Sequence, residues 1–507
     1  MLKKIISISE ASVLLKKLKA NNAKIFLAHG VFDILHLGHI KHFEDIKKKD
    51  SSAKLFVTIT GDNYVKRGPG RPYFKENQRA EMLSSISFVD YVIIIQEETA
   101  QTSINLIKPN IYFKGKDYLN LKDFTGNLKK ELDLVKGYKG KVVFTETKKF
   151  SSSNIINTQF DLLKEEAKTF LSTFSKKNNF DKINNILEKF KNLKVLVLGE
   201  GIIDEYIYTK PLNKTPKENL ISYLRNEKSS FLGGVFAVSN NISSFCNDVT
   251  LLTLAENNSK DSFFIKKNLK KKLNINLISS NKFKNIKKIR FIENSYFPKK
   301  IFELYEMKED YICKRDEKKI LSYLNKNLKK FDIVILNDFG HGFFTNKIID
   351  ILIVKSKYLA INVQTNSGNL PFNLVTKYNK ADYICIDKPE ALLAVGKKNI
   401  SKEEIRNDLF KKIKFKNICI TDGKNGAWYF KNKFFKNVPV FNYNVVDTMG
   451  SGDAFFAISS LASKLSDDAE LITFLGNVAG SMKVSIIGHS KNIDYIDYAK
   501  YVESLLK

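Results

Sequence analysis

The chain has 507 residues, of which 43% are apolar and 27% are charged. These proportions are those of a globular protein and exclude collagen, coiled coil and extended disorder, and the length predicts two or three domains. Apolar runs such as 333–336 are far shorter than the ~18 residues needed to cross a bilayer. Ser7, Ser9 and Glu10 interrupt the N-terminal segment before a signal-peptide core can form. We therefore expect a cytoplasmic protein with no membrane partner.

The net charge of +30, from 84 basic and 54 acidic residues, raises the question of a nucleic-acid partner. Most basic residues are Lys, and they are spread over nearly every segment instead of forming one stripe. We therefore expect a dispersed, solvated surface that favours polyanionic small molecules such as nucleotides, with no specific nucleic acid. An RNA-binding or scaffold protein is the alternative that the charge keeps open. The widely spaced cysteines indicate reduced core residues, with neither a zinc site nor a disulfide framework: Cys246, Cys313, Cys385 and Cys419.

Short β-type runs alternate with helical patterns from Lys24 onward. The predicted strands are 24–28, 54–60, 91–95, 111–113 and 141–144. Helical spacing of apolar residues occupies 39–49, 75–87 and 99–107. This alternation predicts an α/β domain with a parallel sheet over residues 1–160.

Residues 161–192 are polar and rich in Lys and Asn, with apolar residues at helical spacing, and predict a linker of one or two helices. A second α/β pattern then fills residues 193–507. Its predicted strands lie within 194–206, 331–338, 357–363, 382–387 and 417–423. The predicted fold class is therefore α/β, with two Rossmann-like parallel-sheet domains in succession.

The segment HGVFDILHLGH, residues 29–39, follows a predicted strand and is rich in histidine. Gly30 and Gly38 allow backbone to approach a phosphate. His36 and His39 are spaced i to i+3, so both imidazoles share one face of a helix start that already favours an anion. This pattern indicates a polyphosphate cradle whose donors stabilise charge during in-line displacement at an α-phosphate. Two structural histidines beside loop glycines are the competing interpretation.

The segment resembles the GxFDxxHxGH motif of the nucleotidyltransferase superfamily that includes glycerol-3-phosphate cytidylyltransferases and heptose-1-phosphate adenylyltransferases. Every fixed position is matched, by Gly30, Phe32, Asp33, His36, Gly38 and His39. Residues 65–93, 107–118 and 150–156 follow in the order seen in the heptose adenylyltransferases. The resemblance implies that His36 and His39 are catalytic.

The same resemblance implies that Lys66 and Arg79 neutralise triphosphate charge. It also implies a Ser-rich loop that opens a helix beside the nucleotide, formed by Ser151, Ser152 and Ser153. Cytidylyltransferases carry an Arg shortly before that loop, whereas this chain has TETKK at 145–149, so Lys148 or Lys149 must substitute or the contact is absent. We expect ATP to be preferred over CTP, with Mg²⁺ bridging the phosphates and pyrophosphate leaving.

A second site is indicated near the C-terminus, where Gly450, Ser451 and Gly452 precede an apolar helical stretch. Free N–H groups at such a helix start would form an anion hole for a transferred phosphoryl group. Asp453 follows directly, and its carboxylate could accept the proton of an attacking hydroxyl. A glycine-rich turn with one Asp is a weak signal by itself.

The string around Asp453 resembles the DTxGAGD motif of ribokinase-like sugar kinases, with Ser451 in place of Ala. Residues 195–206 resemble that family's opening strand, and residues 336–342 its SDYGKG segment. The resemblance implies sugar binding by Asp204, Gly233 and Gly234, and nucleotide binding by the strand and turn that contain Thr421, Asp422, Gly423 and Gly426. Glu390 would lie on the metal side.

Three departures concern the substrate and metal side. Ala237 stands where heptose kinases have a sugar-contacting Asn, INVQTN (361–366) replaces VDPKG, and Asp387 replaces an Asn. A kinase with a different substrate would explain these changes. A domain retained as a non-catalytic ligand-binding module would also explain them.

The two halves together resemble bifunctional heptose kinase/adenylyltransferases, with the domain order reversed. We expect an enzyme that transfers a nucleotidyl group to a sugar phosphate and phosphorylates a sugar or sugar phosphate with ATP. Its product would serve a surface glycan such as lipopolysaccharide. The apolar region 81–95 could supply the surface of a homodimer.

Overall fold

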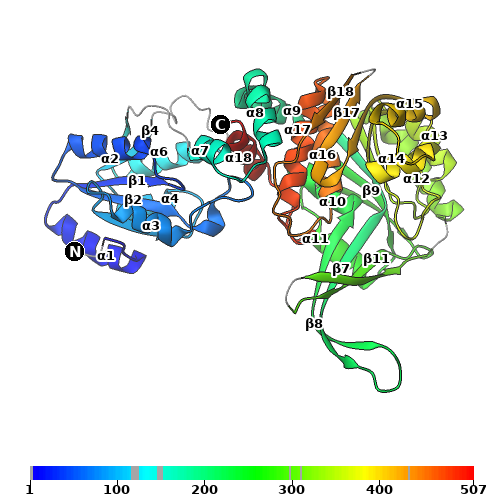
Figure 1. Ribbon diagram of the computed structural model, residues 1–507, viewed down its shortest axis with the longest axis horizontal. Coiled ribbons are helices and arrows are strands. Elements are labelled where there is room, and N and C mark those ends of the chain that lie inside the picture. Colours follow the sequence, from blue (N-terminus) through cyan, green and yellow to red (C-terminus); the bar gives the residue numbers. More distant parts are fainter. Residues whose placement is uncertain (1–3, 116–124, 146–151, 296–297, 309–310, 432–433) are drawn as a thin grey trace. The chain divides into compact units, whose positions relative to one another are not determined.

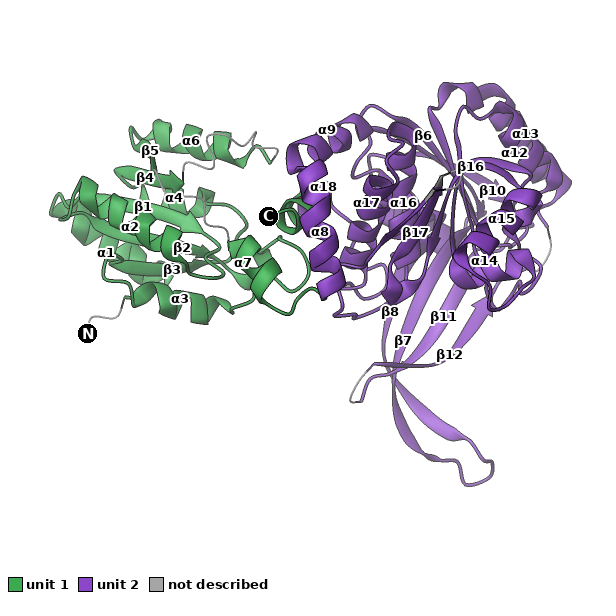
Figure 2. Cartoon of the chain, turned by 45° about the horizontal axis from the view of Figure 1, so that its top comes forward, with its two compact units in different colours: residues 1–164, 499–507 green, residues 165–498 purple. Residues whose placement is uncertain are grey.

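The computed structural model describes residues 4–115, 125–145, 152–295, 298–308, 311–431 and 434–507. The chain divides into two compact units, residues 1–164 with 499–507, and residues 165–498 (Figure 2). Each unit is built on its own large sheet, which confirms the predicted α/β class with two parallel-sheet domains. Among the described helices, none carries an 18-residue stretch apolar enough to span a bilayer.

The first unit is a five-stranded parallel sheet in the order β3-β2-β1-β4-β5. Its strands are β1 Ile25–Gly30, β2 Lys54–Thr60, β3 Tyr91–Ile95, β4 Ile111–Gly115 and β5 Lys141–Thr145. Its helices are α1 Ile8–Ala20, α2 Leu37–Lys49, α3 Glu76–Ser84, α4 Gln101–Ile107, α6 Asn127–Gly137 and α7 Ser152–Gln159, with a 3₁₀ turn at Asp62–Tyr64. The strand order reverses between β1 and β4, so their carboxyl ends form the crevice where ligands bind in such sheets.

Two apolar clusters sandwich this sheet. Phe43 and Ile46 of α2 and Leu83 of α3 pack on one face, whereas α1, α4 and α6 cover the other. Most apolar side chains of 81–95, the region expected to supply a homodimer surface, pack in or against these clusters, and the homodimer stays a prediction. Val92 and Ile95, for example, are fully buried.

The second unit contains a nine-stranded sheet in the order β10-β9-β6-β13-β14-β15-β16-β17-β18, in which β17 pairs antiparallel with both β16 and β18. Its strands are β6 Lys194–Gly199, β9 Asp248–Glu256, β10 Asn274–Ser280, β13 Ile333–Asp338, β14 Leu359–Val363, β15 Lys380–Asp387, β16 Lys414–Thr421, β17 Ala427–Lys431 and β18 Phe434–Val438. The order reverses between β6 and β13, and this reversal places a second ligand crevice at the carboxyl ends of these strands.

Helices surround this sheet (Figure 1). They are α8 Glu165–Lys177, α9 Phe180–Phe190, α10 Val235–Ile242, α11 Lys260–Asn268, α12 Lys314–Asn327, α13 Asn346–Lys355, α14 Lys388–Val395, α15 Lys402–Lys412, α16 Ser451–Leu465 and α17 Ala469–Lys483. The last helix, α18 Tyr495–Leu505, begins in this unit, and its residues from 499 onward group with the first unit. Short 3₁₀ turns lie at Leu328–Lys330, Val375–Lys377 and Gly423–Asn425. A core of Leu, Ile, Val and aromatic side chains fills one face of the sheet beneath α12 to α15.

A smaller four-stranded sheet, which we call the lid, has the order β12-β11-β7-β8. Its strands are β7 Gly201–Lys214, β8 Ile221–Gly234, β11 Ile286–Glu293 and β12 Lys299–Glu306. The long β7–β8 hairpin projects from this unit (Figure 1). The sequence pattern at 194–206 suggested one strand, but Glu200 divides it between the large sheet and the lid.

The expected linker 161–192 is helical, but its two helices belong to the second unit. Phe174 of α8 packs on Phe474 of α17, with ring centroids 4.5 Å apart. Residues 499–507 group with the first unit, where the Ser504 carbonyl accepts from Asn157 Nδ2 at 2.7 Å. By this grouping the first unit ends at Lys164 and the second begins at Glu165, instead of at the predicted boundaries 160/161 and 192/193. The reason is that the apolar faces of α8 and α9 pack within the second unit.

Candidate active sites

The first candidate site lies where β1 ends and α2 begins. Phe32 turns the chain with φ +49°, and His36 caps the helix. The rings of His36 and His39 stack with centroids 3.8 Å apart and an interplanar angle of 15°. Both imidazoles therefore lie on one face of the helix start, as the sequence pattern predicted.

Burial controls the charge of these imidazoles. It lowers the pKa of His39 to about 3, and it lowers the pKa of His36 as well. Both rings are therefore neutral at pH 7 and act as hydrogen-bond donors rather than as fixed cations. Within the described part of the chain, Nδ1 of His39 is buried and has no hydrogen-bond partner.

Asp33 and Arg79 shape the loop that faces this crevice. Asp33 Oδ1 accepts from the backbone N–H groups of Tyr73 at 2.7 Å and Phe74 at 3.0 Å. Arg79 is fully buried, and its guanidinium donates to three backbone carbonyls and to Asp62. Four of its five N–H donors are thus used inside the protein. This corrects the expected triphosphate contact of Arg79, whose position fits a structural role.

The remaining predicted phosphate contacts are placed as follows. Lys66 Nζ pairs with Glu98 at 2.9 Å. Ser152 Oγ donates to the Ile34 carbonyl at 3.1 Å, and Ser153 is buried in α7. Ser151, Lys148 and Lys149 lie outside the described residues.

Arg71 is a cation that the sequence reading overlooked. Its Nη2 donates to Asn157 Oδ1 at 2.7 Å, and burial lowers its pKa to about 10. No salt bridge to it occurs among the described residues. The sequence signal for this cation was its place in the loop RGPGRP (67–72), where it follows a glycine and precedes a proline.

The second candidate site is a cavity of about 280 Å³ at the carboxyl edge of the nine-stranded sheet. Of the predicted residues it gathers Asp204, Gly234, Glu390, Thr421, Gly450, Gly452 and Asp453. Gly233 and Ser451 adjoin lining residues. Asp422, Gly423 and Gly426 lie beyond the lining in the turn after β16, where Asp422 pairs with Lys388 at 3.3 Å. Residues far apart in sequence thus meet around one space.

Asp453 lies in the first turn of α16, beside Gly450 at the helix N-cap. Gly450 has φ +74°, and a Cβ there would lie 2.9 Å from His489 Nε2, so both conformation and space require glycine. Burial raises the pKa of Asp453 to about 6. The carboxylate is therefore ionised at pH 7 and close to the pKa that suits a general base.

Asp204 lies on β7 of the lid and forms an ion pair across it. Its Oδ1 accepts from Arg290 Nη1 at 2.5 Å, and Arg290 Nε also bonds Glu303 Oε2 at 2.6 Å. Gly233 is adjacent, and a Cβ there would overlap Asp204 Oδ2. Arg290 was not predicted from the sequence, because it lies 86 residues from its partner and has no local signature.

Lys288 is the second cation on this face of the lid. It is 7% exposed, lines the cavity and lies between the rings of Tyr305 and Phe339, whose centroids are 5.1 and 5.6 Å from Nζ. Within the described chain no carboxylate is close enough to form a salt bridge with it. A buried ammonium without a counter-ion costs free energy unless a ligand supplies the negative charge.

Glu390 does not face the cavity with a free carboxylate. Its Oε1 accepts from Thr365 N at 3.0 Å and its Oε2 from Asp387 N at 2.8 Å, while Asp387 caps α14 in return. Burial raises the pKa of Glu390 to about 8. In the structure it caps a helix, and its expected metal-side role stays a prediction. Across the described residues, no cluster of three or more His, Cys, Asp or Glu could hold a metal ion.

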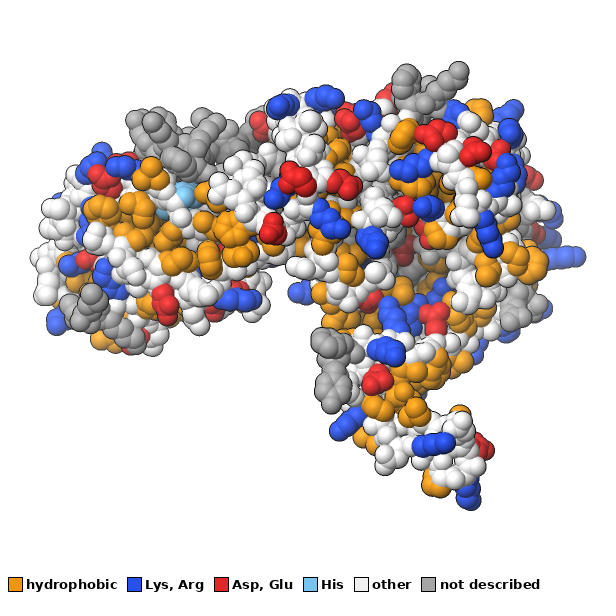
Figure 3. Space-filling view, viewed as in Figure 1, with side chains coloured by type: hydrophobic (Ala, Val, Ile, Leu, Met, Phe, Trp, Pro, Cys, Tyr) orange, Lys and Arg blue, Asp and Glu red, His pale blue; other side chains and the backbone are white. Residues whose placement is uncertain are grey.

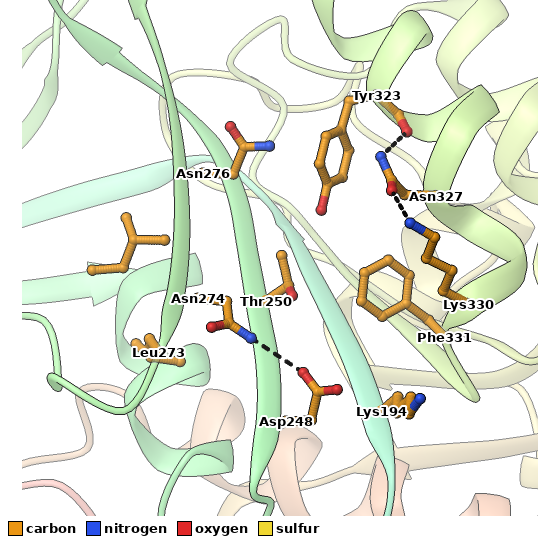
Figure 4. A pocket seen from close by; sticks show the side chains of 11 residues that line it. Lys194, Asp248, Thr250, Leu273, Asn274, Asn276, Tyr323, Asn327, Lys330 and Phe331 are labelled. Carbon is orange, nitrogen blue, oxygen red and sulfur yellow. Dashed lines mark hydrogen bonds between the residues drawn. The ribbon is translucent and has the colours of Figure 1, made fainter.

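A larger cavity, of about 650 Å³, lies at the opposite edge of the same sheet, where Lys194, Asp248 and Asn274 begin their strands. Figure 4 shows that four of its polar side chains bond one another in pairs: Asn274 Nδ2 donates to Asp248, and Lys330 Nζ donates to Asn327. Size therefore does not identify the site here. The smaller cavity at the carboxyl edge contains the convergent titratable groups.

The chain thus contains two α/β units, one with paired imidazoles at a helix start and one with an aspartate beside a glycine turn. Residues 192–494 match the pfkB family of carbohydrate kinases, and residues 27–159 match the cytidylyltransferase-like family. The chain belongs to the pfkB carbohydrate kinase family and carries an N-terminal cytidylyltransferase-like domain.

Curated relatives match over a limited length. A bifunctional protein HldE of Helicobacter pylori is 38% identical over 141 residues, which are 27% of this chain and 30% of that protein. The HldE of Campylobacter jejuni (serotype O:2) is 46% identical over 118 residues, 23% of this chain and 24% of the relative. The chain thus spans less than a third of these relatives. Phosphofructokinase-2 of Escherichia coli, solved in complex with potassium, shares the fold with a TM-score of 0.51 at 12% identity, covering 62% of this chain and 100% of that chain.

Proposed function

We propose that the chain is a bifunctional enzyme, a nucleotidyltransferase that uses ATP in preference to CTP and an ATP-dependent carbohydrate kinase. The observation that carries the kinase half is the placement of Asp453, with a pKa of about 6, in one cavity with the glycine turn and the Asp204–Arg290 pair. The match of residues 27–159 to the cytidylyltransferase-like family supports the transferase half. The sugar-phosphate acceptor follows from the resemblance of residues 65–93 and 107–118 to the heptose adenylyltransferases.

In the transferase reaction, an oxygen of the sugar phosphate attacks the α-phosphorus and pyrophosphate leaves. The neutral rings of His36 and His39 donate hydrogen bonds to the phosphates, and the N-terminal N–H groups of α2 face the same charge. Arg71 takes the cationic role that Arg79 cannot fill. Binding and orientation by these groups suffice, because phosphoryl chemistry of this kind needs no covalent enzyme intermediate.

In the kinase reaction, Asp453 accepts the proton of the acceptor hydroxyl as its oxygen bonds to the γ-phosphorus and ADP leaves. The N–H groups of Gly450, Ser451 and Gly452 stabilise the transferred phosphoryl group. Asp204, fixed by Arg290, holds a second hydroxyl of the sugar. Mg²⁺ would be held largely by the nucleotide phosphates and would neutralise their charge.

The experiment is a panel of D-ribose, D-fructose and a heptose, each free and as its terminal phosphate ester, with each of the four nucleoside triphosphates. Pyrophosphate release reports the transferase, and ADP formation reports the kinase. We expect Asp453→Asn to abolish ADP formation and to leave pyrophosphate release unchanged. Unaltered ADP formation would refute the kinase and favour a ligand-binding module.

An RNA-binding or scaffold function has weaker support. On the described surface seen in Figure 3, Lys and Arg are scattered among acidic and apolar side chains instead of forming a stripe. Nucleic-acid binding would show as a steep loss of affinity with salt. We expect no such binding at physiological ionic strength.

For the product of the proposed enzyme, the destination that we propose is a surface glycan.

A further inference from the structure

Two side-chain amides converge on one oxygen of Asp453. Gln364 Nε2 donates to Asp453 Oδ1 at 2.9 Å, and Asn337 Nδ2 donates to the same oxygen at 3.3 Å. Gln364 follows β14 and Asn337 lies near the end of β13, so both amides come from the carboxyl edge of the large sheet.

The other carboxylate oxygen, Oδ2, is left for a ligand. Among the described residues no group donates a hydrogen bond to it, and Asp453 lines the cavity. A carboxylate whose two oxygens differ in this way has a defined orientation, because rotation about its Cβ–Cγ bond would break both amide bonds.

Gln364 is itself held firmly. Its backbone N–H donates to the Asp338 carbonyl at 2.8 Å, and its own carbonyl accepts from Asn373 Nδ2 at 3.0 Å. Its side-chain Nε2 also lies 3.2 Å from Asn362 Oδ1, and Asn362 Nδ2 in turn donates to the Cys385 carbonyl at 2.8 Å. The amide is thus fixed by strands β13, β14 and β15 before any substrate binds.

We propose that Gln364 is a positioning residue for the kinase reaction, which holds Asp453 by Oδ1 so that Oδ2 faces the acceptor hydroxyl. This inference rests on the proposed kinase function. In the transfer step the hydroxyl proton moves to Oδ2, the acceptor oxygen bonds to the γ-phosphorus, and the bond from that phosphorus to the β–γ bridging oxygen breaks.

Gln364 also favours the charged form of Asp453, as any donor to a carboxylate does. Burial and the nearby Asp204 carboxylate disfavour this charge, whereas Lys288 and Lys483 favour it. Glu390 is a fourth titratable group here, and its pKa of about 8 keeps it largely neutral at pH 7. A variant that removes the amide without adding charge isolates its contribution. Gln364→Met keeps the length of the side chain and removes the donor.

The test measures ADP formation from MgATP with the sugar panel above, as a function of pH, in the full chain. We expect Gln364→Met to lower kcat about tenfold and to move the acidic limb of the kcat/KM profile up by about one pH unit. The KM for MgATP should stay within about twofold. Asn337→Leu should give a smaller shift in the same direction, because its bond is longer.

Pyrophosphate release by Gln364→Met is the internal control for folding. Gln364→Asn is the second variant, because its shorter side chain keeps the amide but does not reach Asp453. A lower rate with an unshifted acidic limb would overturn the positioning role. An unchanged rate and profile would overturn it as well. Loss of the kinase in Asp453→Asn alongside either outcome would leave the proposed function standing, so the two failures are distinguishable.

Discussion

Gly233→Ala tests whether the acceptor side of the kinase cavity is organised around Asp204. A Cβ at this position would overlap Oδ2 of Asp204 and lie 3.1 Å from its Cγ, so the carboxylate must move by about 1 Å. It cannot do so freely, because Arg290 holds Oδ1 at 2.5 Å. A misplacement of that size in a positioning group costs about 100-fold in rate, or about 2.7 kcal/mol.

We therefore expect kcat/KM for the acceptor to fall about 100-fold, with little change in the KM for ATP. Overpacking should also lower the free energy of unfolding by about 1–3 kcal/mol, measurable by denaturant titration. Gly480→Ala in α17 is the matched control, since its Cβ would meet no atom closer than 3.7 Å. A Gly233→Ala enzyme within threefold of the parent would refute the reasoning.

The remaining predictions concern single groups. His39→Ala should lower pyrophosphate release about 100-fold or more and spare ADP formation, because it removes a donor to the phosphates; equal loss of both activities would indicate misfolding instead. Kinase kcat/KM should fall tenfold per pH unit below about pH 6, since burial raises the pKa of Asp453 to about 6 and protonation removes the base. A flat profile down to pH 5 would contradict this assignment. Lys288→Met should weaken kinase kcat/KM at least tenfold while leaving stability to urea unchanged or higher, because burial disfavours the ammonium and no carboxylate of the described chain lies within salt-bridge distance of it.

The strands and motifs were predictable because their signals are local. Apolar runs mark β1 to β5, and the string from Gly30 to His39 specifies a strand, a turn and a helix start in consecutive residues. Helix α1 was also within reach: Ser7 and Glu10 form its capping box, although they were interpreted as polar interruptions.

The partners in the kinase cavity were not predictable in the same way. Arg290 and Lys288 reach Asp204 and the cavity through the pairing of β11 with β7, which the sequence does not encode locally. The burial of Arg79 could not be predicted from the sequence for a related reason. Three of its acceptors are backbone carbonyls from separate segments, those of Val31, Thr60 and Phe74, and backbone acceptors leave no pattern of side chains in the sequence.

The one-residue junction at Glu200 has a thermodynamic consequence. Asp204 lies just beyond it and belongs to the lid, whereas Asp453 and the glycine turn lie at the edge of the large sheet. In the proposed kinase reaction the sugar contacts both sheets. A change in the angle between them would therefore change the affinity for the sugar, and a bound sugar would favour one angle by the same free energy.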